Sequence, residues 1–107
     1  MTNNIDILAT QTLSVKRTAK GMRIWLEGKR PALAGFNRYA AYNRTITDDS
    51  VVLTLSNTGS HNVAGRTRNG KDLPIIDIMQ QQIGAFNIDD KLKAVYTNGM
   101  ITITKED

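Results

Sequence analysis

The sequence contains no cysteine, only one histidine (His61) and only two prolines among its 107 residues. Without cysteine the chain can form neither a disulfide scaffold nor a thiolate metal site, which fits the reducing cytoplasm. A single histidine does not supply the ligand set of a transition-metal site, and no nucleophile–base arrangement surrounds it. We therefore predict no cofactor, no metal site and no enzymatic activity.

Long apolar runs are also missing, and the first residues carry no basic segment. We expect neither a secretion signal nor a membrane span, and we expect a cytoplasmic protein. The formal net charge is +4, and it is unevenly placed. Residues 1–72 carry 11 Lys/Arg against 5 Asp/Glu, whereas residues 73–107 carry 3 against 5. A basic first part suggests an anionic partner.

An internal repeat is the main organisational signal. Shifting the chain by 50 positions aligns apolar and turn positions of residues 12–55 with those of residues 62–105 without gaps. The identities include Phe36 with Phe86 and Asn37 with Asn87. We predict a single domain over residues 1–107 made of these two repeats, which residues 56–61 link.

Each repeat is predicted as a ββαββ unit, so the fold class is β-rich (α+β). The expected strands are 12–16, 23–27, 39–47 and 51–55 in the first repeat, and 63–67, 73–78, 91–97 and 100–104 in the second. Asn69-Gly70 and Asn98-Gly99 are strong hairpin turns. Short helices are expected at 29–34, where Pro31 suits a first turn, and at 79–84.

The repeat also predicts the hydrophobic core. The expected core residues are Ile24, Leu26, Leu33, Phe36, Val51, Leu53, Ile76, Ile78, Ile83, Phe86, Ile101 and Ile103. Trp25 lies in a strand that reads as buried, so core packing is favoured over a role as a stacking platform for a nucleobase.

The segment from Ile76 to Leu92 is similar to the central motif of AbrB/MazE-like proteins, and the segment from Arg23 to Phe36 resembles the SymE-like branch of that superfamily. Such proteins are half-barrels that dimerise by interleaving hairpins, and many bind DNA as antitoxins or transition-state regulators. The resemblance covers about residues 12–104. It implies that two copies in one chain form a swapped-hairpin barrel as an intrachain pseudo-dimer, either monomeric or assembled into a homodimer.

Basic residues crowd the first hairpin of each repeat, and in AbrB-like DNA binders this region carries the phosphate contacts. Lysine and arginine there would neutralise phosphates and release counterions. Alternatively, these side chains are only the solvated surface of a polar hairpin. The candidate nucleic-acid-binding residues are Lys16, Arg17, Lys20, Arg23, Lys29, Arg30, Arg66, Arg68 and Lys71.

Two functions from different classes follow from these observations. The first is a small regulatory protein of bacterial, phage or plasmid origin that binds nucleic acid, with duplex DNA favoured and RNA a further possibility. The second is a protein-interaction module that modulates a toxin, a methyltransferase or a host-defence complex. The first function predicts nucleic-acid binding whose affinity falls steeply with salt. The second predicts little affinity for nucleic acid at physiological salt.

Overall fold

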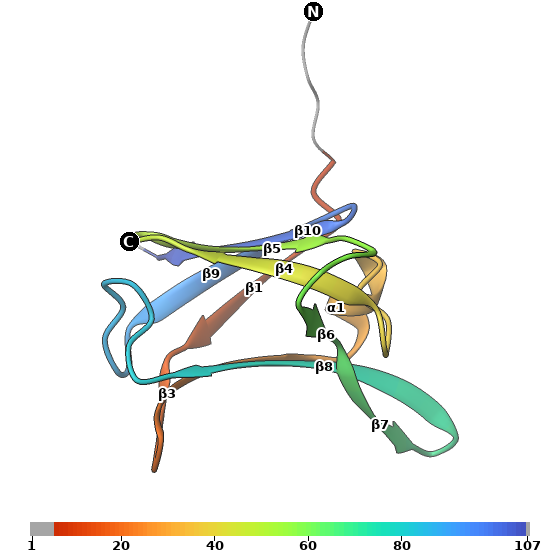
Figure 1. The fold of residues 1–107 in the computed structure, drawn as a ribbon, viewed down its shortest axis with the longest axis horizontal. Coiled ribbons are helices and arrows are strands. Elements are labelled where there is room, and N and C mark those ends of the chain that lie inside the picture. Colours follow the sequence, from red (N-terminus) through yellow and green to blue (C-terminus); the bar gives the residue numbers. More distant parts are fainter. Residues whose placement is uncertain (1–5, 107) are drawn as a thin grey trace, which may run out of the picture.

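Residues 6–106 of the chain are described by a computed structural model, in which strands dominate and every strand pair is antiparallel. The strands form a six-stranded and a four-stranded sheet that face each other as two layers (Figure 1). The six-stranded sheet has the order β1 (Ala9–Ser14), β9 (Lys91–Thr97), β10 (Met100–Lys105), β5 (Ser50–Leu55), β4 (Ala41–Ile46) and β6 (His61–Asn62). The four-stranded sheet has the order β2 (Lys16–Thr18), β3 (Gly21–Glu27), β8 (Lys71–Gln80) and β7 (Ala64–Arg68).

The hairpins follow the turn chemistry of the sequence. Asn69 and Gly70 both adopt positive φ, of 53° and 75°, as a two-residue turn of type I′ requires. Gly99 has a φ of 78° in the turn between β9 and β10. The predicted strands 91–97 and 100–104 are therefore confirmed, since β9 has the predicted bounds and β10 is one residue longer.

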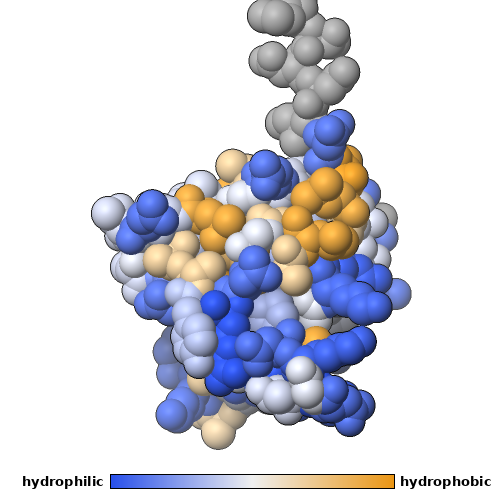
Figure 2. Space-filling model, turned by 90° about the vertical axis from the view of Figure 1, so that its right-hand side faces the viewer, coloured by the Kyte–Doolittle hydropathy of each residue, from blue (hydrophilic) through white to orange (hydrophobic). Residues whose placement is uncertain are grey.

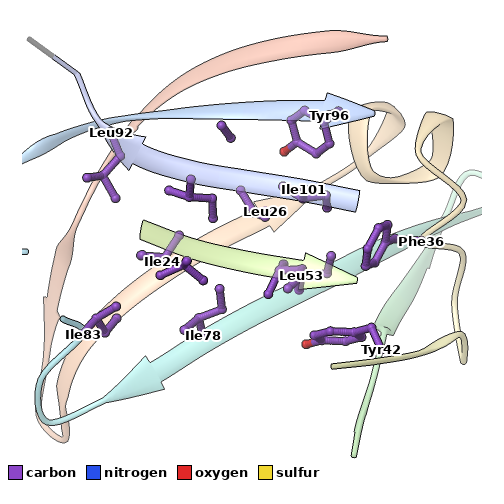
Figure 3. Close-up of a cluster of buried hydrophobic side chains, with 14 of the residues drawn as sticks. Ile24, Leu26, Phe36, Tyr42, Leu53, Ile78, Ile83, Leu92, Tyr96 and Ile101 are labelled. Carbon is purple, nitrogen blue, oxygen red and sulfur yellow. The ribbon is translucent and has the colours of Figure 1, made fainter. Parts of the chain in front are cut away.

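The core lies between the two sheets, where alternate residues of facing strands meet (Figure 3). Ile24 and Leu26 of β3 are fully buried, as is Leu53 of β5 on the opposite layer. Eleven of the twelve predicted core residues are buried, and Leu33 is wrong because it is 58% exposed on the short helix. Seven further residues of the same buried cluster were missed: Val15, Ala34, Tyr42, Val63, Leu92, Ala94 and Tyr96.

The predicted barrel is wrong, because the two sheets do not close on each other. Among residues 6–106, no strand pairing joins the four-stranded sheet to the six-stranded one. The chain passes from one layer to the other at buried valines, Val15 between β1 and β2 and Val63 between β6 and β7. Each valine hydrogen-bonds the opposite half of the chain, for example through Val15 N to Asp90 O at 3.1 Å. These crossings end one sheet and begin the other.

The helix predicted at 79–84 is also wrong. The helix at 29–34 is confirmed as α1 (Lys29–Leu33), but β8 continues to Gln80 and the chain then turns. Gln82 donates from its amide nitrogen to the carbonyl oxygens of Gly84 and Phe86, at 2.9 and 3.1 Å. These bonds stabilise a compact turn in place of the predicted helix. The ββαββ unit thus has its helix only in the first half.

Candidate nucleic-acid interface

The outer face of the four-stranded sheet gathers five of the nine predicted binding residues. Ile24 and Leu26 point into the core, so Arg23, which alternates with them, points outward. Cross-strand partners share a face, so the registers of β2, β7 and β8 assign the remaining side chains. The basic residues on this face are Lys16, Arg23, Arg66, Arg68 and Lys71.

Arg23 is neutralised within this face. Its Nε donates to Oδ1 of Asp77 on β8 at 3.0 Å. Its guanidinium carbon lies 5.3 Å from the ring centroid of Trp25, a cation–π distance. Its Nη2 also lies 3.9 Å from the sulfur of Met79. Arg23 is therefore fixed by three neighbours and contributes little free positive charge.

A second set of contacts neutralises Arg66. Glu27 accepts hydrogen bonds from Nε1 of Trp25 and from Nη2 of Arg66, both at 3.1 Å. The centre of the face is therefore a chain of paired groups that runs across three strands. Trp25 links the two pairs, because it contacts Arg23 as well as Glu27.

The unpaired positive charge lies at the two ends of this face. Among the described residues, Lys16, Arg68 and Lys71 are exposed and form no ion pair. Lys16 lies on β2 at one end, and Arg68 lies opposite Lys71 beside the β7–β8 turn at the other end. Such exposed cations are available to an anion in solution.

The two basic ends are separated along β8. Lys16 pairs with Arg23, which pairs with Met79, whereas the β7–β8 turn precedes Lys71. The eight steps from Met79 to Lys71 along the strand span about 26 Å. Figure 1 shows the two hairpins at opposite ends of the molecule, each bending away from the six-stranded sheet. Figure 2 views the β7–β8 end, whose lower part is mostly hydrophilic.

Four predicted residues lie elsewhere. Arg17 alternates with Lys16 and so points to the opposite side of the hairpin, and Lys20 lies in the β2–β3 turn. Lys29 and Arg30 lie on α1, after the far end of β3. Burial raises the pKa of Tyr96, and the positive charge of Arg30 opposes part of this rise, so that the pKa is about 12. The structure therefore does not bring these four residues into the sheet face.

Trp25 and its acidic neighbours were missed as members of this surface. The expectation that Trp25 is a core residue is wrong, because it is only half-buried and lies on the face opposite Ile24 and Leu26. The signal was present in the strand itself, since Trp25 alternates with the two core residues and shares a parity with Arg23 and Glu27.

No family model, curated protein or solved structure gives a significant match to this chain. In residues 6–106, none of the helical structure has the length and apolarity needed to cross a bilayer. Over that same range, no group of three or more histidine, aspartate or glutamate side chains lies close enough to hold a metal ion.

Proposed function

We propose that this chain is a non-catalytic protein that binds duplex DNA through the outer face of its four-stranded sheet. The observation that carries the proposal is the placement of Lys16 at one end of this face and of Arg68 and Lys71 at the other. The separation of about 26 Å along the strand lets the two ends reach phosphates within one helical turn of B-DNA, about 34–36 Å. Two cationic ends with this separation fit phosphates on one side of a duplex.

The paired centre of the face suits the same partner. Arg23 and Arg66 are held by Asp77 and Glu27, so they add little to the phosphate attraction. Contacts that involve only phosphates position a protein on DNA but do not read its sequence. The expected activity is therefore binding with weak sequence preference and a strong dependence on salt.

We also propose that the two halves of the chain are related by an approximate two-fold axis, as in a swapped-hairpin pseudo-dimer. β3 pairs antiparallel with β8, and β5 pairs antiparallel with β10 through Val52 and Thr102, which are 50 positions apart. Tyr39 and Asp89, also 50 apart, both adopt positive φ. Such symmetry would make the β2–β3 and β7–β8 hairpins equivalent ends of the four-stranded sheet. This supports the proposal that both ends of the sheet bind phosphates.

The test is charge reversal at the basic ends. The triple variant K16E/R68E/K71E removes the unpaired cations, and we expect it to reduce the slope of log K against log salt by about 2.7, at about 0.9 per phosphate contact. The matched control is K91E/K93E, which reverses exposed lysines on the outer face of the six-stranded sheet. Equal losses of duplex affinity in both variants would reject the assignment of the face.

A protein-interaction module is the second candidate, and a different surface favours it. The outer face of the six-stranded sheet has an apolar hollow lined by Ile7, Val95, Thr97, Met100 and Thr102. Ile7 is 61% exposed and Met100 is 39% exposed. Hydrophobic colour gathers in the upper part of Figure 2, near the start of the described chain. Under this function, Met100→Lys would abolish binding of a protein partner, whereas K16E/R68E/K71E would leave it intact.

A further inference from the structure

Strand β1 has an open edge at one side of the six-stranded sheet. Its strand partner within residues 6–106 is β9, and over that range no backbone group of β1 forms a hydrogen bond outside this pair. One row of main-chain N–H and C=O groups along β1 therefore faces away from the sheet. Such a row is a template for pairing with another strand.

The other sheet edges within residues 6–106 carry features that prevent such pairing. β6 has only two residues. β2 carries Lys16 and Arg17, and β7 carries Arg66 and Arg68. Short length and exposed charge are common protection of edge strands. β1 differs, because its six residues, Ala-Thr-Gln-Thr-Leu-Ser, include no charge, proline or glycine. β1 is therefore the described edge best suited to a strand partner.

The side chains of β1 that point between the two sheets are incompletely covered. Gln11 and Leu13 pair with Ala94 and Leu92 of the neighbouring strand β9. Those two β9 residues are fully buried, whereas Gln11 and Leu13 are only half-buried. The part of the chain from residue 6 to residue 106 therefore does not fully close this side of the core. A further strand beside β1 would complete the cover.

Gln11 also has an unused hydrogen-bond donor. Its Oε1 accepts a hydrogen bond from the hydroxyl group of Tyr96 at 2.8 Å, which orients the amide group. Its Nε2 donates to no other group within residues 6–106 and is open to solvent. The nitrogen is therefore available to an acceptor that lies across the open edge.

We propose that two copies of this chain form a dimer in which β1 pairs with β1 of the second copy. The pairing is antiparallel about a two-fold axis normal to the sheet, and it joins the two six-stranded sheets into one. Opposite residues must then share a face, so one residue of β1 lies on the axis and pairs with its own copy. This inference does not depend on the proposed function, because it concerns an edge of the other sheet.

The side chains of β1 favour a register with Gln11 on the axis. Ala9 then lies opposite Leu13 of the second copy, and Thr10 lies opposite Thr12. Apolar side chains therefore meet on the inner face, hydroxyl groups meet on the outer face, and no like charges are opposed. The two Gln11 side chains meet on the axis, where Nε2 of each can donate to Oε1 of the other.

The experiment measures the mass of the protein in solution by sedimentation and exchanges charges across the proposed contact. Thr10 and Thr12 are exposed on the outer face of β1, so both can be replaced without disturbing the core. The wild-type protein should have twice the mass of one chain. T10K/T12K opposes lysine to lysine twice, and we expect it to weaken the dimer about tenfold. The matched control T10K/T12E opposes lysine to glutamate twice and should dimerise at least as tightly as wild type.

A cross-link tests the residue on the axis. The sequence contains no cysteine, so Gln11→Cys introduces a single thiol. Cα atoms of opposite residues in an antiparallel pair lie about 4.5–5.5 Å apart, within the range of a disulfide. Oxidised Gln11→Cys should therefore form a covalent dimer, whereas Thr54→Cys, exposed on β5, should stay uncross-linked.

Three results would overturn the inference. The first is a wild-type protein that remains a monomer up to about 1 mM, which would leave the edge to a strand of a different protein. The second is a dimer that T10K/T12K does not weaken, which would place the contact on another surface. The third is a T10K/T12E variant that dimerises as weakly as T10K/T12K, because the proposed register pairs these two positions. Duplex binding by a monomer would leave the sheet-face proposal standing.

Discussion

Replacing Gly84 by alanine tests the close contact between the segment after β8 and the β4–β5 turn. Gly84 has a φ of 51°, and a Cβ there would overlap the carbonyl oxygen of Thr47 and lie 3.2 Å from that of Asp48. Ala85 N donates to Asp48 O at 2.9 Å, so movement of this turn would also strain that hydrogen bond. Gly70 is the matched control, because its φ is 75° but a Cβ there would meet nothing within 4 Å.

The magnitude follows from these contacts. Positive φ costs alanine about 1 kcal/mol in either variant. Displacing a packed backbone costs about 1–3 kcal/mol more, and a lost hydrogen bond adds about 1 kcal/mol. Gly84→Ala should therefore lose about 3–5 kcal/mol of unfolding free energy, and Gly70→Ala only about 1 kcal/mol. Urea denaturation followed by circular dichroism measures both. If the losses of unfolding free energy in Gly84→Ala and Gly70→Ala differ by less than about 1 kcal/mol, the close contact of Gly84 with the β4–β5 turn is refuted.

Two further stability predictions concern the core and a pH-sensitive turn. Phe36→Ala should cost about 3–5 kcal/mol because Phe36 is fully buried, whereas Leu33→Ala should change stability by less than about 0.5 kcal/mol, as calorimetry can check. The pKa of Asp90 is lowered, first by the hydrogen bond from Asn87 N and then by Lys105, so its carboxylate stabilises the fold above its ordinary pKa. This contribution should disappear as the pH falls through the lowered pKa, and Asp90→Asn should flatten the acid limb of the stability curve; an unchanged limb would show that the carboxylate does not contribute.

The strands and most of the core could be predicted from the sequence because both depend on local patterns. Alternation places Ile24 and Leu26 on one face of a strand, and Asn-Gly specifies a two-residue hairpin turn without help from tertiary contacts. The same alternation excludes Trp25 from the core. The general tendency of tryptophan to be buried predicts the opposite for Trp25. Because Trp25 is only half-buried, alternation along the strand is the better guide to which side chains enter the core.

The arrangement of the sheets could not be predicted in the same way. The crossings at Val15 and Val63 depend on hydrogen bonds to residues more than 20 positions away, and no local pattern specifies them. The candidate site was predictable only in part. Charge density identified the two hairpins, but the pairing of Arg23 with Asp77 spans 54 positions and became visible only through the register of β3 and β8.

The most direct test of the central claim is the affinity of the wild-type protein for a random-sequence 20-base-pair duplex, measured by fluorescence anisotropy between about 50 and 200 mM salt. Three unpaired cations on the sheet face, Lys16, Arg68 and Lys71, predict a slope of log K against log salt of about −2.7. No detectable binding at about 50 mM salt, or an affinity that does not change with salt, would contradict the claim that this face binds the phosphates of duplex DNA.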